Sequence, residues 1–366
     1  MATKSSNRTG NDFGFINVAV GRFSAIGDVT MSIPVVYSAC RCYPDVRFIM
    51  VTRRSMQNIF VNPPENLTVV GVDLKDDYKG IPGMRRLASE LKNDYRVDAF
   101  IDLHDVIRTR ILGFFLKSKG VKIFRLHKGR ANKKALTRRR NKVMLPLISS
   151  RARYREAFFN AGLPLSERFD GLYSGRNAAP ASLFAEITKP KNYGEVWVGI
   201  APFAAHKGKI YPPEKMEQVL SRLILSRPDV KVFLFGGGEE ETRLLDEWAS
   251  RYPRVQSNAG KRYGFAAELA LLNHIDTLVT MDSANMHLAS VAGTPTLSVW
   301  GATHPYCGFK GWRQPDTNTV SLNMTCRPCS VFGEKPCFRG DYLCLTAITP
   351  EMIYNRLINM LPEPKK

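Results

Sequence analysis

IDTLVTMDSANMHLASVAGTPTLSVWGATHP, residues 275–305, alternates apolar runs with polar and glycine-containing turns. Residues 275–281 predict a buried strand, because the run is apolar and polar residues follow it directly. Residues 286–292 predict a short helix that Gly293 closes, and Pro295 opens a second apolar strand, residues 296–300. A strand, a helix and a second strand in succession are typical of a parallel α/β sheet.

The junction between the first of these strands and the helix carries polar side chains. Asp282 and Ser283 are N-cap residue types, and His287 follows one turn later. A helix N-terminus after a strand presents backbone N–H groups, which is how α/β proteins bind phosphate. The junction therefore indicates a binding site. Each residue also has a structural alternative, since Asp282 could cap the helix and His287 could be a packed, hydrogen-bonded side chain.

The same alternation of strands and helices runs through the chain in two series. The first series has expected strands at residues 15–21, 47–52, 67–72, 97–103 and 121–125. The second adds strands at 196–201 and 230–235, and helices near 213–226, 239–251 and 265–273. Residues 171–194, rich in Gly, Asn, Ala, Pro and Lys, predict a linker. We therefore expect an α/β protein with two parallel sheets, and a final amphipathic helix at 350–361.

Three segments match the motifs of one known family. The pattern Asp-Ser/Thr-Gly/Ala-x-x-His-Leu-Ala-x-x-x-Gly-x-Pro-Thr-x-x-x-x-Gly is matched at every position from Asp282 to Gly301. A second pattern, Ser-x-x-Gly-Asp-x-x-x-x-x-Pro, is matched by Ser24, Gly27, Asp28 and Pro34. A third, Lys-x-aromatic-Pro, is matched by Lys209, Tyr211 and Pro212, with Tyr where Trp is usual. In these motifs the chain resembles the ADP-heptose:lipopolysaccharide heptosyltransferases, glycosyltransferase family 9.

This resemblance covers about residues 15–361 and implies the GT-B fold, in which two Rossmann-like domains face each other across a cleft. We expect an N-terminal acceptor-binding domain, residues 1–178 with the C-terminal helix 349–366, and a C-terminal nucleotide-sugar-binding domain, residues 179–348. The family implies inverting transfer without cofactor. The sequence contains no Asp-x-Asp, the motif with which metal-dependent transferases hold a cation, so we expect metal-independent chemistry.

The resemblance places the donor, ADP-heptose by family default, in the C-terminal domain. Lys209 would stabilise the leaving diphosphate, and Asp282 would bind sugar hydroxyls. The remaining expected donor contacts are Gly27, Ala204, Ala205, Ser283, Ala284, Met286 and His287. The two alanines replace frequent hydroxyl residues, so they would contribute backbone N–H groups.

A glycine turn follows the expected strand 230–235. Gly237 would allow close approach of a nucleotide, and Glu240, or alternatively Glu241, would accept hydrogen bonds from ribose hydroxyls. The structural alternative is that these glutamates stabilise the N-terminus of the next helix electrostatically.

Asp28 is the expected general base for the acceptor hydroxyl, with helix capping as its structural alternative. Ser24 and Arg108 are expected on the acceptor side. The segment IDLHDVIRTR, residues 101–110, resembles the family's Asp-Leu-x-x-x-x-Arg-Ser stretch, with Thr109 in place of Ser. Arg108 would meet an acidic acceptor sugar.

Charge narrows the class of partner. The 366 residues carry 53 Lys and Arg against 33 Asp and Glu, a formal charge of +20, which favours an anionic partner. No nucleic-acid-binding motif is present, so we expect no nucleic acid. The basic run at residues 125–142 suits an anionic glycolipid acceptor and peripheral contact with the inner membrane face, with a solvated segment as the alternative. The polar first residues lack the apolar core of a signal peptide, which predicts a cytoplasmic protein.

Four of the seven cysteines have the spacing C-x2-C-x7-C-x6-C. They are Cys326, Cys329, Cys337 and Cys344. The spacing fits either a structural metal site or a packed thiol loop, and a catalytic role is not expected.

The sequence thus predicts an inverting glycosyltransferase that moves a sugar, a heptose by family default, to a lipopolysaccharide-core or similar anionic glycolipid. Two alternatives stay open at this stage. One is a nucleotide-sugar epimerase of the same fold, and the other is a non-catalytic protein that binds anionic glycan or membrane.

Overall fold

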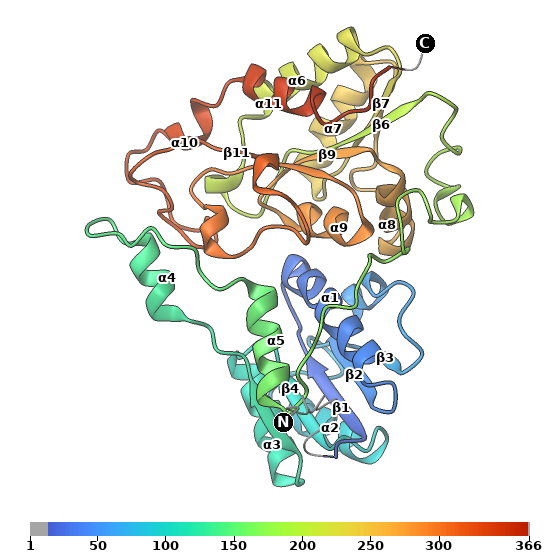
Figure 1. The fold of residues 1–366 in the computed structure, drawn as a ribbon, viewed down its shortest axis with the longest axis vertical. Helices are drawn as coiled ribbons and strands as arrows, with labels where there is room; N and C mark the ends of the chain where they lie inside the picture. Colours follow the sequence, from blue (N-terminus) through green and yellow to red (C-terminus); the bar gives the residue numbers. More distant parts are fainter. Residues whose placement is uncertain (1–13, 365–366) are drawn as a thin grey trace, which may run out of the picture. The chain divides into compact units, whose positions relative to one another are not determined.

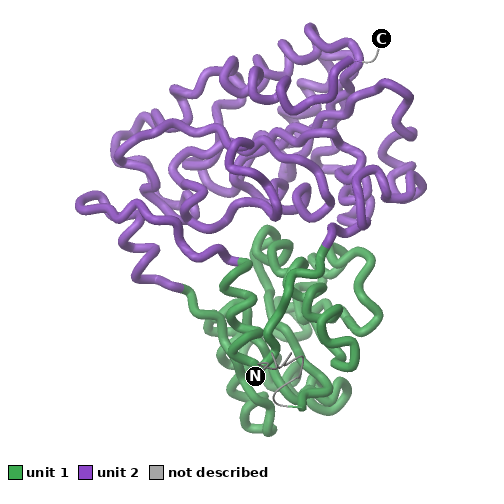
Figure 2. The backbone as a smooth tube through the Cα atoms, in the orientation of Figure 1, with its two compact units in different colours: residues 1–128, 151–169 green, residues 129–150, 170–366 purple. Residues whose placement is uncertain are grey.

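The computed structural model describes residues 14–364, and these form two compact units (Figure 2). Unit 1 contains the chain up to Lys128 together with Arg151–Phe169, and unit 2 contains Gly129–Ser150 and the chain from Asp170 onward. The expectation that the protein is not exported depends on the polar N-terminal stretch. That stretch lies outside the residues that the structure describes. None of the helices within 14–364 is both long and apolar enough to span a membrane.

Unit 1 is built on a five-stranded parallel sheet with the order β3-β2-β1-β4-β5 (Figure 1). Its strands are β1 (Asn17–Gly21), β2 (Arg47–Arg53), β3 (Leu67–Val72), β4 (Ala99–Asp102) and β5 (Lys122–Arg125). Its helices are α1 (Ile26–Cys42), the 3₁₀ helix η1 (Arg54–Ile59), α2 (Gly80–Asn93), α3 (Ile107–Ser118) and α5 (Ser150–Asn160). The core on one face joins Leu87 of α2 and Leu112 of α3 to Phe100 of β4. All five strands expected in this half are confirmed.

Unit 2 has a six-stranded parallel sheet with the order β11-β10-β9-β6-β7-β8. Its strands are β6 (Val196–Ala201), β7 (Val230–Leu234), β8 (Val255–Ser257), β9 (Thr277–Met281), β10 (Thr296–Val299) and β11 (Thr319–Val320). Its main helices are α4 (Arg130–Thr137), α6 (Pro213–Ser226), α7 (Glu239–Arg251), α8 (Phe265–His274), α9 (Ala284–Ala292) and α11 (Pro350–Ile358). Short helices are η2 (Ala181–Phe184), η3 (Lys207–Lys209), η4 (Pro305–Cys307), η5 (Asp316–Asn318) and α10 (Leu343–Thr346).

Helices cover both faces of the unit 2 sheet. Helices α6, α7 and α11 lie on one face, and α8 and α9 lie on the other (Figure 1). Trp248 of α7 and Leu220 of α6 are fully buried against strands β6 and β7, in the core of the first face. Burial on both faces explains why these strands are continuous apolar runs in the sequence.

The C-terminal helix belongs to unit 2, not to the first domain as expected. Ile353 and Leu357 of α11 are completely buried in the same core as Leu220 and Leu223 of α6. The amphipathic pattern correctly predicted a packed helix, but it carries no information about which surface the helix covers.

The chain also divides at other places than the expected residue 178. Residues 129–150 belong to unit 2, and the expected linker at 171–194 does too. Asn273 of α8 fixes that stretch, because its side-chain oxygen accepts hydrogen bonds from the backbone N–H groups of Ala178 and Ala179 at 2.8 and 2.9 Å. This buried asparagine of α8 therefore helps to bind the Gly- and Pro-rich stretch to unit 2.

Candidate donor and acceptor sites

Each sheet has one point where the order of connections reverses, which is where α/β proteins bind ligands beyond the strand ends. In unit 1 this point lies between β1 and β4, and in unit 2 it lies between β6 and β9. The expected site residues follow these strands: Asp28 comes after β1, Lys209 after β6 and Asp282 after β9. The topology therefore brings the expected residues of each half to the strand ends at its own switch point.

In unit 2 the structure brings Lys209 and Asp282 into direct contact. The Lys209 ammonium lies 3.0 Å from Asp282 Oδ2, and the two side chains are 15% and 3% exposed. Thr303, which the sequence analysis did not select, donates a hydrogen bond to the same carboxylate oxygen at 2.8 Å. A carboxylate this deeply buried needs such partners, and they fix it at the end of β9.

A glycine loop lies over the stem of Lys209. Gly333 has a φ of +83°, and a Cβ built on it would lie 2.7 Å from Lys209 Cγ. The loop is held in place by the Gly333 N–H, which donates to Ser330 Oγ at 2.9 Å. The absence of a side chain at position 333 is therefore what leaves room for the lysine. Sequence reasoning missed this residue, because no local pattern connects it with a lysine 124 positions earlier.

Helix α9 begins at the expected junction. Ser283 is its N-cap residue with extended backbone, although its hydroxyl makes no capping hydrogen bond and instead lies 3.3 Å from Thr280 Oγ1. Ala284 begins the helix, and Met286 and His287 are buried within it. The junction thus has the strand-to-helix form that suits a phosphate, and Asp282 bonds to Lys209 and Thr303.

The glycine turn after β7 separates the two candidate glutamates. Glu241 Oε2 accepts a hydrogen bond from the Gly237 N–H at 2.8 Å, so this side chain already serves the turn. Glu240 is exposed at the start of α7. This difference favours Glu240 over Glu241 as a group available to a ribose. Ala204 is half-buried and Ala205 is exposed in the loop after β6.

In unit 1 the Asp28 carboxylate forms an ion pair with Arg22. Arg22 is buried, and it also donates to the carbonyl oxygen of Leu103 at 2.6 Å, which connects the ends of β1 and β4. Asp28 Oδ2 accepts a long hydrogen bond of 3.4 Å from the Ala25 N–H, so the capping alternative is also realised. The same side chain therefore caps α1 and is held by a buried cation. A charged residue directly after a buried strand was the signal by which Arg22 could have been found.

A histidine missed by the sequence analysis lies in the same group. Burial and the Arg22 cation lower the pKa of His104 to about 3, so its imidazole is neutral near pH 7. Its Nδ1 atom is buried and makes no hydrogen bond in the structure. Nearby, burial raises the pKa of Asp102, although that carboxylate accepts backbone hydrogen bonds from His104 and Asp105.

The remaining acceptor-side residues differ in how they are used. Ser24 is half-buried between β1 and α1, close in sequence to Asp28. Gly27, which was expected as a donor contact, is half-buried at the start of α1 and belongs to unit 1. Arg108 is half-buried in the first turn of α3. Thr109, which stands where the family has Ser, is completely buried and exchanges hydrogen bonds with the Val106 backbone at 3.0 Å. Its hydroxyl therefore stabilises the start of α3.

The four spaced cysteines come together in unit 2. Cys326, Cys329, Cys337 and Cys344 line one small cavity of about 10 Å³. Burial raises the pKa of Cys344 to about 11, so this thiol is protonated near neutral pH. Within residues 14–364 no three side chains of the types His, Cys, Asp or Glu are arranged to hold a metal ion. Both alternatives, a structural metal site and a packed thiol loop, therefore stay predictions.

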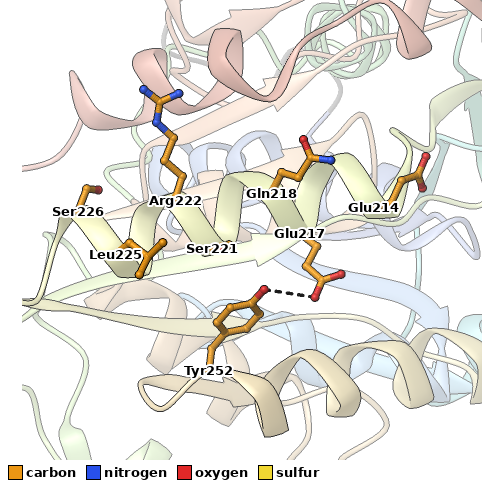
Figure 3. A pocket seen from close by; sticks show the side chains of 8 residues that line it. All are labelled: Glu214, Glu217, Gln218, Ser221, Arg222, Leu225, Ser226 and Tyr252. Carbon is orange, nitrogen blue, oxygen red and sulfur yellow. Dashed lines mark hydrogen bonds between the residues drawn. The ribbon is translucent and has the colours of Figure 1, made fainter.

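An open surface hollow of about 750 Å³ lies elsewhere on unit 2, along α6 (Figure 3). Glu217 and Tyr252 face each other across it, with the Tyr252 hydroxyl donating to the carboxylate at 3.4 Å. The hollow contains none of the expected site residues and lies on the outer side of a helix. We therefore do not assign the ligand to it.

Two parallel sheets, each with polar residues gathered at its switch point, are the architecture expected of the GT-B fold. The family model of glycosyltransferase family 9 (heptosyltransferase) matches residues 84–336, more than half of the chain. The protein belongs to this family, and the expected family and fold are confirmed.

Individual relatives agree with this assignment. The chain is 22% identical over 300 residues to lipopolysaccharide heptosyltransferase 1 of Campylobacter coli, which covers 80% of this chain and 85% of the relative. It shares the fold of the E. coli ADP-heptose lipopolysaccharide heptosyltransferase II with a TM-score of 0.67 and 15% identity, over 94% of this chain and 98% of that one. The fold is also similar to that of TibC, an iron-containing dodecameric glycosyltransferase from enterotoxigenic E. coli, with a TM-score of 0.53 and 12% identity over 94% and 76% of the chains.

Proposed function

We propose that this glycosyltransferase moves a heptose from ADP-heptose to a sugar of a lipopolysaccharide-type core, with inversion at the anomeric carbon and without a metal ion. The observation that carries the proposal is the Lys209–Asp282 ion pair at the switch point of unit 2. This pair lies within family motifs, and the E. coli neighbour is described as an ADP-heptose enzyme. A fixed cation beside a helix N-terminus is the chemistry that a departing diphosphate requires.

In the proposed reaction the acceptor hydroxyl oxygen attacks the anomeric carbon on the face opposite the diphosphate. The new carbon–oxygen bond forms as the bond to the β-phosphate oxygen breaks, and the electron pair leaves with ADP. The Lys209 ammonium and the N-terminal N–H groups of α9 stabilise the added negative charge on that leaving group. In this proposal Asp282 fixes the lysine and accepts a hydrogen bond from a sugar hydroxyl.

The hydroxyl proton goes to the carboxylate of Asp28 in this proposal. Arg22 supports that role, because its ion pair and its hydrogen bond to Leu103 hold the carboxylate in one orientation. His104 is a weaker candidate for the base, since its pKa of about 3 leaves it little affinity for a proton. Arg108 and Ser24 would contact the acceptor, for which the resemblance is their support.

The proposed acceptor is an anionic glycolipid, so we place the enzyme in the cytoplasm with peripheral contact to the inner membrane face. The formal charge of +20 supports an anionic partner. No nucleic-acid partner is proposed.

A thermal-shift titration with ADP, UDP, GDP and CMP tests the donor site. We expect a saturable stabilisation by ADP in the wild type that is weakened at least tenfold in apparent affinity by Lys209→Ala. Lys207→Ala is the matched control, because Lys207 lies in the same 3₁₀ helix with its ammonium 5.3 Å from the centre of the Tyr342 ring. Equal ADP responses in the two variants would remove Lys209 from the proposal.

The two alternatives give other results in the same preparation. An epimerase would consume ADP-heptose when no acceptor is present, whereas the proposed transferase would need the acceptor. A glycan-binding protein without activity would show no preference among the four nucleotides.

A further inference from the structure

Residues 138–148, RRRNKVMLPLI, form an exposed surface that we call the basic–apolar segment. It lies in the part of unit 2 that precedes α5, residues 129–150, which contains seven Lys or Arg and no Asp or Glu. Arg138, Arg139 and Arg140 are all exposed. No acidic side chain on this stretch neutralises them, so it is a local concentration of positive charge.

Large apolar side chains are exposed next to these arginines. Val143, Met144, Leu145 and Ile148 are 40%, 43%, 66% and 56% exposed. Single exposed aliphatic residues are ordinary on a protein surface, but four within six residues form a patch that usually serves binding. Phe338, 51% exposed, lies beside the same segment with Arg139 4.3 Å from its ring centre.

The basic–apolar segment has no helix or strand after α4, yet it is fixed to unit 2. The Lys142 ammonium donates to the carbonyl oxygens of Cys326 and Pro328 at 2.7 and 2.9 Å. The Leu147 N–H donates to the carbonyl oxygen of Tyr306 at 2.9 Å. These bonds hold the segment against the cysteine-containing loop, so its arginines and aliphatic side chains are presented on a defined surface.

We propose that the basic–apolar segment docks on an anionic membrane surface. The aliphatic side chains would enter the boundary between headgroups and acyl chains, while the arginines would pair with lipid phosphates. This combination distinguishes the partner, since a nucleic acid offers no apolar layer for Val143, Met144, Leu145 and Ile148. A second copy of the chain is disfavoured as well, because a self-complementary contact would oppose like charges. The inference rests on the proposed function in one respect, the membrane-bound nature of the acceptor.

Vesicle flotation tests the inference with the full chain. We expect binding to vesicles of 70% phosphatidylcholine and 30% phosphatidylglycerol, and at least about tenfold weaker partitioning to phosphatidylcholine alone. The double variant Leu145→Glu/Ile148→Glu should lose at least about tenfold in partitioning, because two aliphatic groups can no longer enter the interface. Arg138→Ala/Arg140→Ala should lower binding and reduce its dependence on salt. The matched control is Leu183→Glu/Leu225→Glu, two leucines of unit 2 that are 44% and 82% exposed away from the segment, and it should bind like the wild type.

Each of the other outcomes overturns the inference. Unchanged partitioning of the Glu double variant would show that the segment does not touch lipid. A dimer of the wild type that the same variant dissociates would assign the segment to self-association. Tight binding to a single-stranded oligonucleotide, lost in the arginine variant while vesicle binding persists, would assign it to nucleic acid. The thermal response to ADP is measured in every variant, so that a failure of the donor proposal and a failure of the membrane proposal are told apart.

Discussion

Gly333→Ala should damage the donor site through Lys209, and the structure supplies an unusually close control for it. Gly333 and Gly340 lie in the same loop region with φ angles of +83° and +81°. A Cβ at position 333 would meet Lys209 Cγ, Cε and Cδ at 2.7, 3.1 and 3.2 Å, whereas a Cβ at position 340 would meet nothing within 4 Å. The two alanine variants therefore share the backbone strain and differ in the contact with the lysine.

The expected size of the effect follows from these distances. Placing alanine in the left-handed region costs about 1–2 kcal/mol at either position. Ordinary carbon contacts lie near 3.5–4.0 Å, so the stem of Lys209 must move by roughly 1 Å in Gly333→Ala alone. That movement weakens the 3.0 Å ion pair and leaves the buried Asp282 with Thr303 as its remaining partner. Breaking a buried ion pair completely costs about 3–5 kcal/mol. Because the lysine stem is flexible, we expect Gly333→Ala to lower the free energy of unfolding by about 1–3 kcal/mol more than Gly340→Ala does.

The assay has two readouts. Urea denaturation should give a lower free energy of unfolding for Gly333→Ala than for Gly340→Ala, and calorimetric titration should give roughly tenfold weaker ADP binding for Gly333→Ala only. Equal stabilities and equal ADP affinities for the two variants would refute the reasoning, because the contact with Lys209 would then have no consequence.

Three further predictions follow from other parts of the structure. Asp28→Asn should lower the transfer rate roughly 10²–10⁴-fold with ADP binding nearly unchanged, and a parallel loss of ADP binding would count against the role as base. Burial raises the pKa of Glu268 from 4.5 to about 7, so the folded state favours the neutral acid. The contribution of this group to the free energy of unfolding is therefore complete below about pH 4.5 and is lost as the pH rises through 7. At pH 8, Glu268→Gln should therefore be more stable than the wild type by up to about 3 kcal/mol, and at pH 4.5 the difference should be much smaller. Denaturation curves that show the same difference in stability at both pH values would contradict this. Leu357→Ala should destabilise unit 2 by about 2–4 kcal/mol, seen as faster amide hydrogen exchange in α6 and in the strands beneath it, while exchange in the unit 1 sheet stays unchanged.

The strands were predictable because parallel sheets bury both faces of each strand. The runs at 196–201 and 230–235 are apolar throughout and correspond to β6 and β7 within one residue at each end. β8 and β11, of 3 and 2 residues, were missed. They lie at the two edges of the unit 2 sheet, where a strand needs few apolar residues and leaves almost no periodic signal.

The pairing of Lys209 with Asp282 follows from topology and not from local pattern. Strands β6 and β9 are neighbours in the sheet, so the residues that follow their carboxyl ends must lie at the same edge although 73 positions separate them in the chain. The motif identified both residues as donor contacts, and the sheet order explains why they meet. Thr303 and Gly333 could not be found in the same way, because each acts through one contact made by a loop whose path no sequence pattern determines.

The two ion pairs at the switch points also impose different demands on the proposed chemistry. Lys209 must keep a stable position while charge develops on the leaving group, and its partner Asp282 is only 3% exposed, so the pair is largely shielded from water. Asp28 must accept a proton, and its side chain is 24% exposed while its partner Arg22 is 9% exposed. The buried member of the acceptor-side pair is thus the cation, and the more accessible member is the carboxylate that would react. In the Lys209–Asp282 pair the carboxylate is the more buried member, whereas in the Arg22–Asp28 pair it is the cation. We expect this difference if the first pair stabilises a leaving group and the second orients a base, so Asp28 and Asp282 could not exchange their roles.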